Sequence, residues 1–184
     1  MAVCGCGEQL AGSPPILDGG PADDLGIIIS GTFDNTIVTA VAGTAWRPLP
    51  ADDFTLTNFA LGTEGEFDAR YLYDGFNLDL IMSFKFGSDS TFGGGTWSVA
   101  LPWVPQDMTG VIQGHAVLGP WSAFDASTGD FWQGFVYRAA SGDLAFRFGD
   151  DLAGTNGAVN ATTPFTFATD DELSFIVRFE ADSN

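Results

Sequence analysis

Apolar side chains recur at every second position through much of this 184-residue chain, and this period decides the fold class. The clearest segment is residues 78–86, where the apolar positions are Leu78, Leu80, Met82, Phe84 and Phe86. Four further segments repeat the period: 97–101, 131–137, 144–148 and 173–179. Successive side chains of a strand point to opposite faces, so each segment predicts a strand with one buried face.

Turn sequences separate these segments at short intervals. They are Asp74-Gly75, Gly93 to Gly95, Thr128-Gly129-Asp130 and Ser141-Gly142-Asp143. Glycine and aspartate favour tight turns, and no window shows helical periodicity over more than two turns. About eight short strands joined by turns predict an all-β fold, an antiparallel β-sandwich that is jelly-roll-like.

The first 45 residues follow a different pattern. Residues 1–24 are rich in Gly, Ser, Pro and Asp and have no period, which predicts an extended N-terminal arm. In residues 25–45, two isoleucine-rich runs flank a turn and predict a short strand pair or docking segment. The β-sandwich domain is then residues 46–184.

Charge and cysteine usage limit the partners and the compartment. Six basic and 24 acidic side chains give a net charge of −18, which disfavours contact with nucleic acid or an anionic membrane. We find no targeting or membrane-spanning segment. Cys4 and Cys6, the only cysteines, are too close to bond to each other without strain. We therefore expect a disulfide-free fold that assembles in a reducing cytosol.

No residue pattern indicates an enzyme. The one histidine, His115, would have to serve any Ser–His–Asp triad, but no nucleophile-elbow pattern surrounds a serine, so we interpret it as a strand residue. Four adjacent acidic pairs are Asp23-Asp24, Asp52-Asp53, Asp150-Asp151 and Asp170-Asp171. Adjacent side chains of a strand point to opposite faces, and these pairs lie in predicted loops, so we interpret them as solvated loop charge.

We also expect no metal ion or cofactor. Asp125, Ser127 and Asp130 offer oxygen ligands for Ca²⁺ near a turn, but they lack the full calcium-loop pattern. Cys4 and Cys6 supply two thiolates where a structural zinc site takes about four ligands, so zinc would require several copies. No lysine follows the Gly93 to Gly95 loop, which excludes a phosphate cradle.

Three tryptophans are candidate stacking faces for a sugar: Trp103, Trp121 and Trp132. The alternative is that they fill a sandwich core or a subunit contact. We favour the second interpretation.

The order of several motifs resembles that of a known family. A Gly-x-Gly loop, Gly93 to Gly95, precedes a strand that closes in Leu101-Pro102. Near the end of the chain, Thr163-Pro164-Phe165-Thr166 leads to an acid-x-Leu turn, Asp171-Glu172-Leu173. Residues 46–181 thereby resemble a family of β-sandwich domains in virion proteins of tailed bacteriophages, the minor tail proteins. Two differences are Asp170, where the family has Gly, and the first 45 residues, which do not match.

The resemblance implies a structural role and no catalytic site. We expect a component of a tailed-phage particle, located in the virion after assembly in the host cytoplasm and anchored to other virion proteins by its N-terminal arm. We also expect it to form a homo-oligomer. Two alternatives are a capsid-surface decoration protein and a virion module that binds a host-surface glycan.

Overall fold

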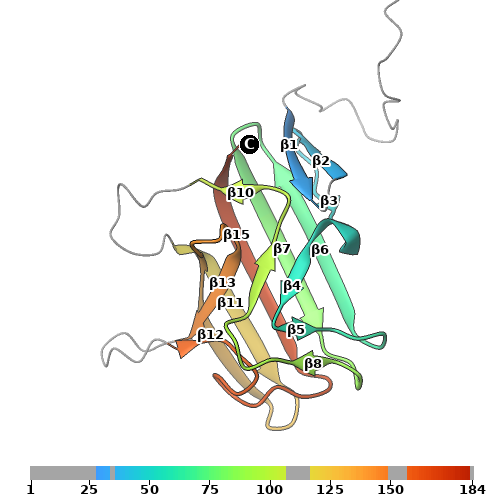
Figure 1. Ribbon diagram of the computed structural model, residues 1–184, viewed down its shortest axis with the longest axis vertical. Coiled ribbons are helices and arrows are strands. Elements are labelled where there is room, and N and C mark those ends of the chain that lie inside the picture. Colours follow the sequence, from blue (N-terminus) through green and yellow to red (C-terminus); the bar gives the residue numbers. More distant parts are fainter. Residues whose placement is uncertain (1–27, 34–35, 107–116, 149–156, 183–184) are drawn as a thin grey trace, which may run out of the picture.

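The computed structural model describes residues 28–33, 36–106, 117–148 and 157–182 (Figure 1). The predicted arm (1–24), Cys4, Cys6 and His115 lie outside these ranges. Within them every regular element is a strand, apart from one turn of 3₁₀ helix, η1 (Ala51–Asp53). The all-β prediction is confirmed. No helix in the described ranges has the length and apolar character that crossing a membrane requires.

Fifteen strands are present in the described residues. In chain order they are β1 (Ile28–Phe33), β2 (Thr36–Val41), β3 (Arg47–Pro48), β4 (Thr55–Thr57), β5 (Phe59–Ala60), β6 (Glu66–Tyr73), β7 (Asn77–Lys85), β8 (Thr91–Phe92), β9 (Ser98–Ala100), β10 (Val104–Pro105), β11 (Val117–Asp125), β12 (Asp130–Arg138), β13 (Leu144–Phe148), β14 (Gly157–Ala158) and β15 (Glu172–Asp182). Every pairing among them is antiparallel.

Eleven of these strands form one sheet that curls on itself. Its main order is β3-β6-β7-β15-β11-β12-β13-β9-β4, with β10 also paired to β15 and β14 to β13. Laid flat, nine strands would separate β3 from β4 by about 38 Å. Residues 49–54, which join these two strands, span at most about 25 Å. The connection therefore forces the β9–β4 end to fold back over β6 and β7, as Figure 1 shows.

The core lies between the two layers of the curled sheet. The nine-residue register of β7 with β15 sets Leu80 opposite Val177 and Met82 opposite Phe175, and all four side chains are buried. Ring contacts cross the space between layers: Phe146 of β13 lies 5.2 Å from Phe175 between ring centroids. Burial of these alternating positions is the main force that holds the layers together, and it confirms the antiparallel sandwich.

Five strands coincide with the periodic segments of the sequence, namely β7, β9, β12, β13 and β15. Strand β11, which runs from Val117 to Asp125, is not among the periodic segments. The reason is a bulge between Val117 and Gly119, followed by Pro120, which together hide the two-residue period.

Three predicted turns, at Gly75, Gly129 and Gly142, adopt backbone conformations that favour glycine. Gly75 joins β6 to β7 with φ of 97°, and Gly129 lies in the β11–β12 turn with φ of 81°. In the second turn the Gly129 N–H donates to the Asp125 carbonyl at 2.8 Å. L side chains rarely adopt such φ values, so the sequence marks these turns by the residue they require.

Strands β1 and β2 form a separate two-stranded sheet at one end of the sandwich (Figure 1). The chain joins this hairpin to the body directly after β2, where Gly43 N–H donates to the Tyr73 carbonyl at 2.9 Å. Ala40 and Ala42 are fully buried in the core cluster. The end of β2 is therefore fixed on the sandwich.

Candidate functional site

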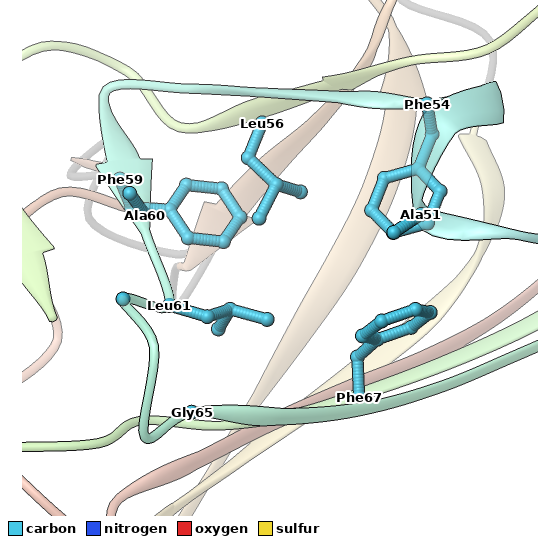
Figure 2. Close-up of a pocket in the computed structure, with 9 residues that line it drawn as sticks. Ala51, Phe54, Leu56, Phe59, Ala60, Leu61, Gly65 and Phe67 are labelled. Atoms are coloured by element: carbon cyan, nitrogen blue, oxygen red, sulfur yellow. The ribbon is translucent and has the colours of Figure 1, made fainter.

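An apolar pocket of about 320 Å³ opens between η1, β4, β5 and the start of β6 (Figure 2). Phe54, Leu56 and Phe59 line it from one side. Phe67 lines the opposite side, meets Phe54 edge to face at 5.4 Å and remains 41% exposed. Every lining side chain is apolar, so the pocket can hold an apolar group but offers no acid, base, nucleophile or metal ligand.

One wall of this pocket is a loop tied down by Asp89. Its carboxylate accepts hydrogen bonds from Thr63 N–H at 2.7 Å, from Thr63 Oγ1 at 2.6 Å and from Glu64 N–H at 3.1 Å. The hydroxyl of Thr63, together with the two N–H groups, lowers the pKa of Asp89 to about 2. Gly62 has φ of 69°, and a Cβ there would lie 2.2 Å from Asp89 Oδ1. The wall therefore depends on glycine and on an ionised carboxylate.

A polar hollow of about 240 Å³ lies on the outer side of β6 and β7. Glu66, Lys85 and Glu172 occupy neighbouring register positions along it. Lys85 pairs with Asp170 at 3.0 Å, and this hydrogen bond and charge raise the lysine pKa. Both partners are about half exposed, so water screens the pair, and the hollow has no dry site for acid–base chemistry.

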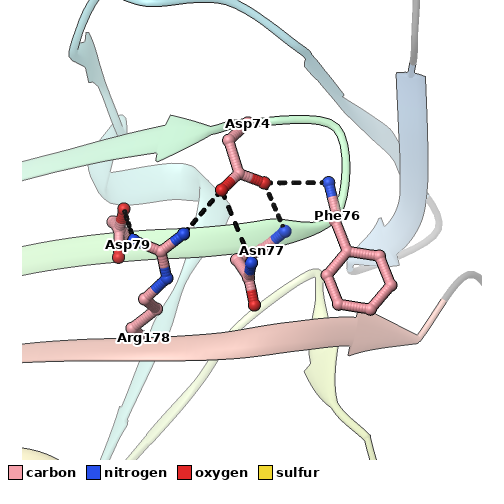
Figure 3. A network of polar contacts seen from close by, with 5 residues as sticks. All are labelled: Asp74, Phe76, Asn77, Asp79 and Arg178. Carbon is pink, nitrogen blue, oxygen red and sulfur yellow. Dashed lines mark hydrogen bonds and ion pairs between the residues drawn. The ribbon is translucent and has the colours of Figure 1, made fainter.

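A second charged cluster fixes the β6–β7 turn (Figure 3). Asp74 accepts hydrogen bonds from Phe76 N–H at 2.9 Å and Asn77 N–H at 2.6 Å, and it pairs with Arg178 Nη2 at 2.6 Å. Burial alone would raise the pKa of Asp74, but these contacts outweigh it and the pKa lies below its usual range. Arg178 also reaches Asp79 at 3.4 Å. The cluster links the turn to β15, which is a structural role.

Asp171 corrects the interpretation of its pair as solvated loop charge. Asp170 is exposed, but Asp171 is 1% exposed and accepts hydrogen bonds from Ala126 N–H at 2.9 Å and Ala168 N–H at 2.7 Å. Burial raises the pKa of Asp171. Its carboxylate thereby joins two loops through their backbone N–H groups. Neighbouring acidic residues give no sequence signal for which one turns inward.

In the candidate calcium loop, the Asp125 carboxylate accepts hydrogen bonds from groups of the loop itself. Asp125 Oδ1 accepts hydrogen bonds from the Ser127 N–H at 2.9 Å and from Ser127 Oγ at 2.7 Å. The Ser127 hydroxyl, with the turn N–H groups, lowers the pKa of Asp125. Among the described residues, no three His, Cys, Asp or Glu side chains are grouped so that they could hold a metal ion.

The three candidate tryptophans do not form a sugar platform. Trp103 and Trp121 are each 1% exposed and belong to the core cluster. Trp132 is half-buried and stacks on Phe165 with ring centroids 6.2 Å apart. The alternative interpretation as core residues is correct for Trp103 and Trp121.

The remaining acidic pairs and the glycine loop lie at these places in the fold. Asp52 and Asp53 lie on η1, and Gly93 to Gly95 connects β8 to β9. In that loop Gly93 N–H donates to the Asn58 carbonyl at 2.7 Å, so its backbone serves the fold. Asp23, Asp24, Asp150 and Asp151 lie outside the described residues, like His115 and both cysteines.

One exposed surface was not predicted from the sequence. We call the outward side of β6, β7, β15, β11 and β12 the outer face. Large apolar side chains lie open on it: Ile81 is 38% exposed, Ile176 47% and Phe131 74%. Ile81 and Ile176 interrupt otherwise polar outward positions of β7 and β15, so alternation did not single them out. For β12 the predicted buried face was wrong: Phe131 and Phe135 of segment 131–137 lie on the outward side, and the inward positions are Trp132, Gly134 and Val136.

The chain was compared with known protein families, curated proteins and solved structures. The chain matches no family model, no curated protein and no solved structure.

Proposed function

We propose that the protein is a structural component of a tailed-phage particle, a minor tail protein anchored to other virion proteins through its N-terminal arm. The resemblance of residues 46–181 to tail-protein sandwich domains supports the class of particle. The observation that carries the anchoring role is the β1–β2 hairpin, which stands between residues 1–24 and the sandwich.

The hairpin suits a docking element because its backbone pairing is self-contained. In the described part of the chain, β1 and β2 pair with each other and with no strand outside the hairpin. A two-stranded sheet is marginally stable alone, and its open edges accept a strand from another chain. The buried Ala40 and Ala42 hold the end of β2 on the body. A neighbouring subunit that adds a strand would stabilise the hairpin and anchor the sandwich.

The sandwich itself supports a role without a reaction. Its apolar pocket has no ionisable lining residue, and its polar hollow is open to water. Asp171, the most buried carboxylate described, is occupied by two backbone N–H groups. A structural subunit that only presents surfaces to its neighbours requires no catalytic groups.

The arm can be tested by deletion. Particles assembled with the full chain should contain it, whereas a chain lacking residues 1–24 should fold with an unchanged melting temperature and be absent from purified particles. Immunoblots of gradient-purified particles give the readout. Retained incorporation of the shortened chain would remove the arm from the mechanism, and absence of the full chain would overturn the virion role.

Antibody labelling of the same particles separates the placements. Label on the tail supports the minor tail protein. Label spread over the head would replace it with the capsid-surface decoration protein.

A further inference from the structure

We propose that the outer face binds a second copy of this chain, so that the protein forms a dimer with two-fold symmetry. This inference does not rest on the proposed function, because self-association in dilute solution needs no particle.

The contact is centred on an apolar band that crosses four neighbouring strands. Ile81 of β7 is paired with Ile176 of β15, and Pro120 of β11 is paired with Phe135 of β12. The pairing of Trp121 with Phe175 places Pro120 next to Ile176 across β11 and β15. With strands about 4.8 Å apart, the band is about 14 Å long. Single exposed apolar residues are ordinary, but a continuous band in the middle of a sheet indicates a contact surface.

The row of residues beside the band has short side chains, which leave room for a second sheet to approach. The neighbouring row consists of Ser83, Ser174 and Ser122, which are partners in the strand register. Ser122 Oγ and Ser174 Oγ are 3.0 Å apart and hydrogen-bonded to each other. Ser122 and Ser174 already share this hydrogen bond, so covering that pair costs little.

Charge permits a copy of the same chain at this face. The outward positions of β6, β7 and residues 172–180 of β15 carry three basic residues, Arg70, Lys85 and Arg178, and five acidic ones, Glu66, Asp68, Asp79, Glu172 and Glu180. Half of the chain's six basic residues are therefore here, whereas the chain as a whole has 24 acidic residues. This part of the surface is less acidic than the chain as a whole, so two copies repel each other less through it.

The two ends of the band complement each other. Arg70 of β6 is paired with Ile81 at one end, and Phe135 of β12 forms the other. A two-fold axis parallel to β15 sets Ile176 against its own copy, and Ile81 against Pro120. The same axis brings Arg70 of each copy over Phe135 of the other, which makes two cation–π contacts.

Sedimentation velocity of the full chain over a concentration series tests the proposal. We expect a reversible monomer–dimer equilibrium that tightens between about 0.1 and 0.5 M NaCl, because salt screens the remaining repulsion. Ile176→Lys places two like charges at the axis and should abolish the dimer. Phe76→Lys is the matched control, since Phe76 is 61% exposed on the β6–β7 turn, away from the band.

Phe135→Leu tests the symmetry, because it keeps apolar contact and removes both cation–π contacts while the Arg70–Asp68 ion pair stays in place. It should weaken the dimer about tenfold. Circular dichroism and thermal melting of each variant verify that it is folded.

A wild-type chain that stays monomeric at both salt concentrations would overturn the proposal. So would a dimer that survives Ile176→Lys, or assembly into open chains in place of a closed dimer. None of these outcomes bears on particle incorporation, which depends on residues 1–24.

Discussion

Trp103 and Trp121 are equally buried, at 1% exposure, but their indole N–H groups differ. Trp121 Nε1 donates to the Arg147 carbonyl at 2.8 Å, whereas Trp103 Nε1 is buried with no hydrogen-bond partner. A buried donor without a partner costs free energy, while a satisfied donor contributes to the fold. The two residues therefore form a natural comparison.

We expect Trp121→Phe to destabilise the protein by about 1–2 kcal/mol more than Trp103→Phe. Both substitutions lose similar apolar area, but the first also removes the hydrogen bond from Trp121 to the Arg147 carbonyl, and the second removes an unsatisfied group. Urea unfolding followed by fluorescence measures both. Equal losses of unfolding free energy would contradict this account.

At the residue scale, the sequence predicts which apolar side chains are buried but not which polar side chains point into the interior. Phe84 and Phe175 are buried as their period predicts. Asp170 and Asp171 are chemically identical neighbours, yet Lys85 pairs with one in solvent and backbone N–H groups bind the other in the interior. The difference arises from a loop 45 residues away, at Ala126, which no local pattern contains.

At the scale of elements, the loop from Leu61 to Gly65 depends on one carboxylate on another loop. Asp89 holds Thr63 and Glu64, and the loop in turn forms a wall of the apolar pocket. Because the folded-state pKa of Asp89 is about 2, below the ordinary 3.8, its ionised form stabilises the fold. This contribution is complete above the ordinary pKa and is lost as the pH falls towards 2.

We expect Asp89→Asn to lower the urea midpoint at pH 7, because the amide cannot accept all three hydrogen bonds. The difference from wild type should shrink between pH 4 and pH 2, where wild-type Asp89 itself becomes protonated. Asp52→Asn, at an exposed position of η1, is the control. A difference that stays constant over this pH range would show that the carboxylate charge is not what holds the loop.

Elements were predictable where they are long and one-sided. Strands β7 and β15 have 9 and 11 residues and display the period fully. Strands β5, β8, β10 and β14 have two residues each, too few to show any period. The apolar pocket was equally hidden, because Phe54 and Phe67 meet only after the sheet has curled.

At the scale of the whole molecule, a net charge of −18 opposes the compact state. Folding brings acidic side chains closer together than they are in the unfolded chain, and salt screens the resulting repulsion. Local pairs such as Arg178 with Asp74 offset only part of it.

The melting temperature should therefore rise as NaCl increases from low to physiological concentration and beyond. Differential scanning calorimetry measures it at a protein concentration low enough to keep the chain monomeric. The Ile176→Lys variant, measured in parallel, separates screening within one chain from dimer formation. A melting temperature independent of salt would show that the acidic groups are already too far apart to repel.

The position of β15 has a consequence for biosynthesis. This strand lies between β7 and β11, and both are translated before it. A nascent chain released only as far as residue 171 leaves those two long edges without the segment that joins them. Until β15 inserts, both edges expose unpaired backbone to other chains, so the central sheet cannot be completed without the segment from Glu172 onward.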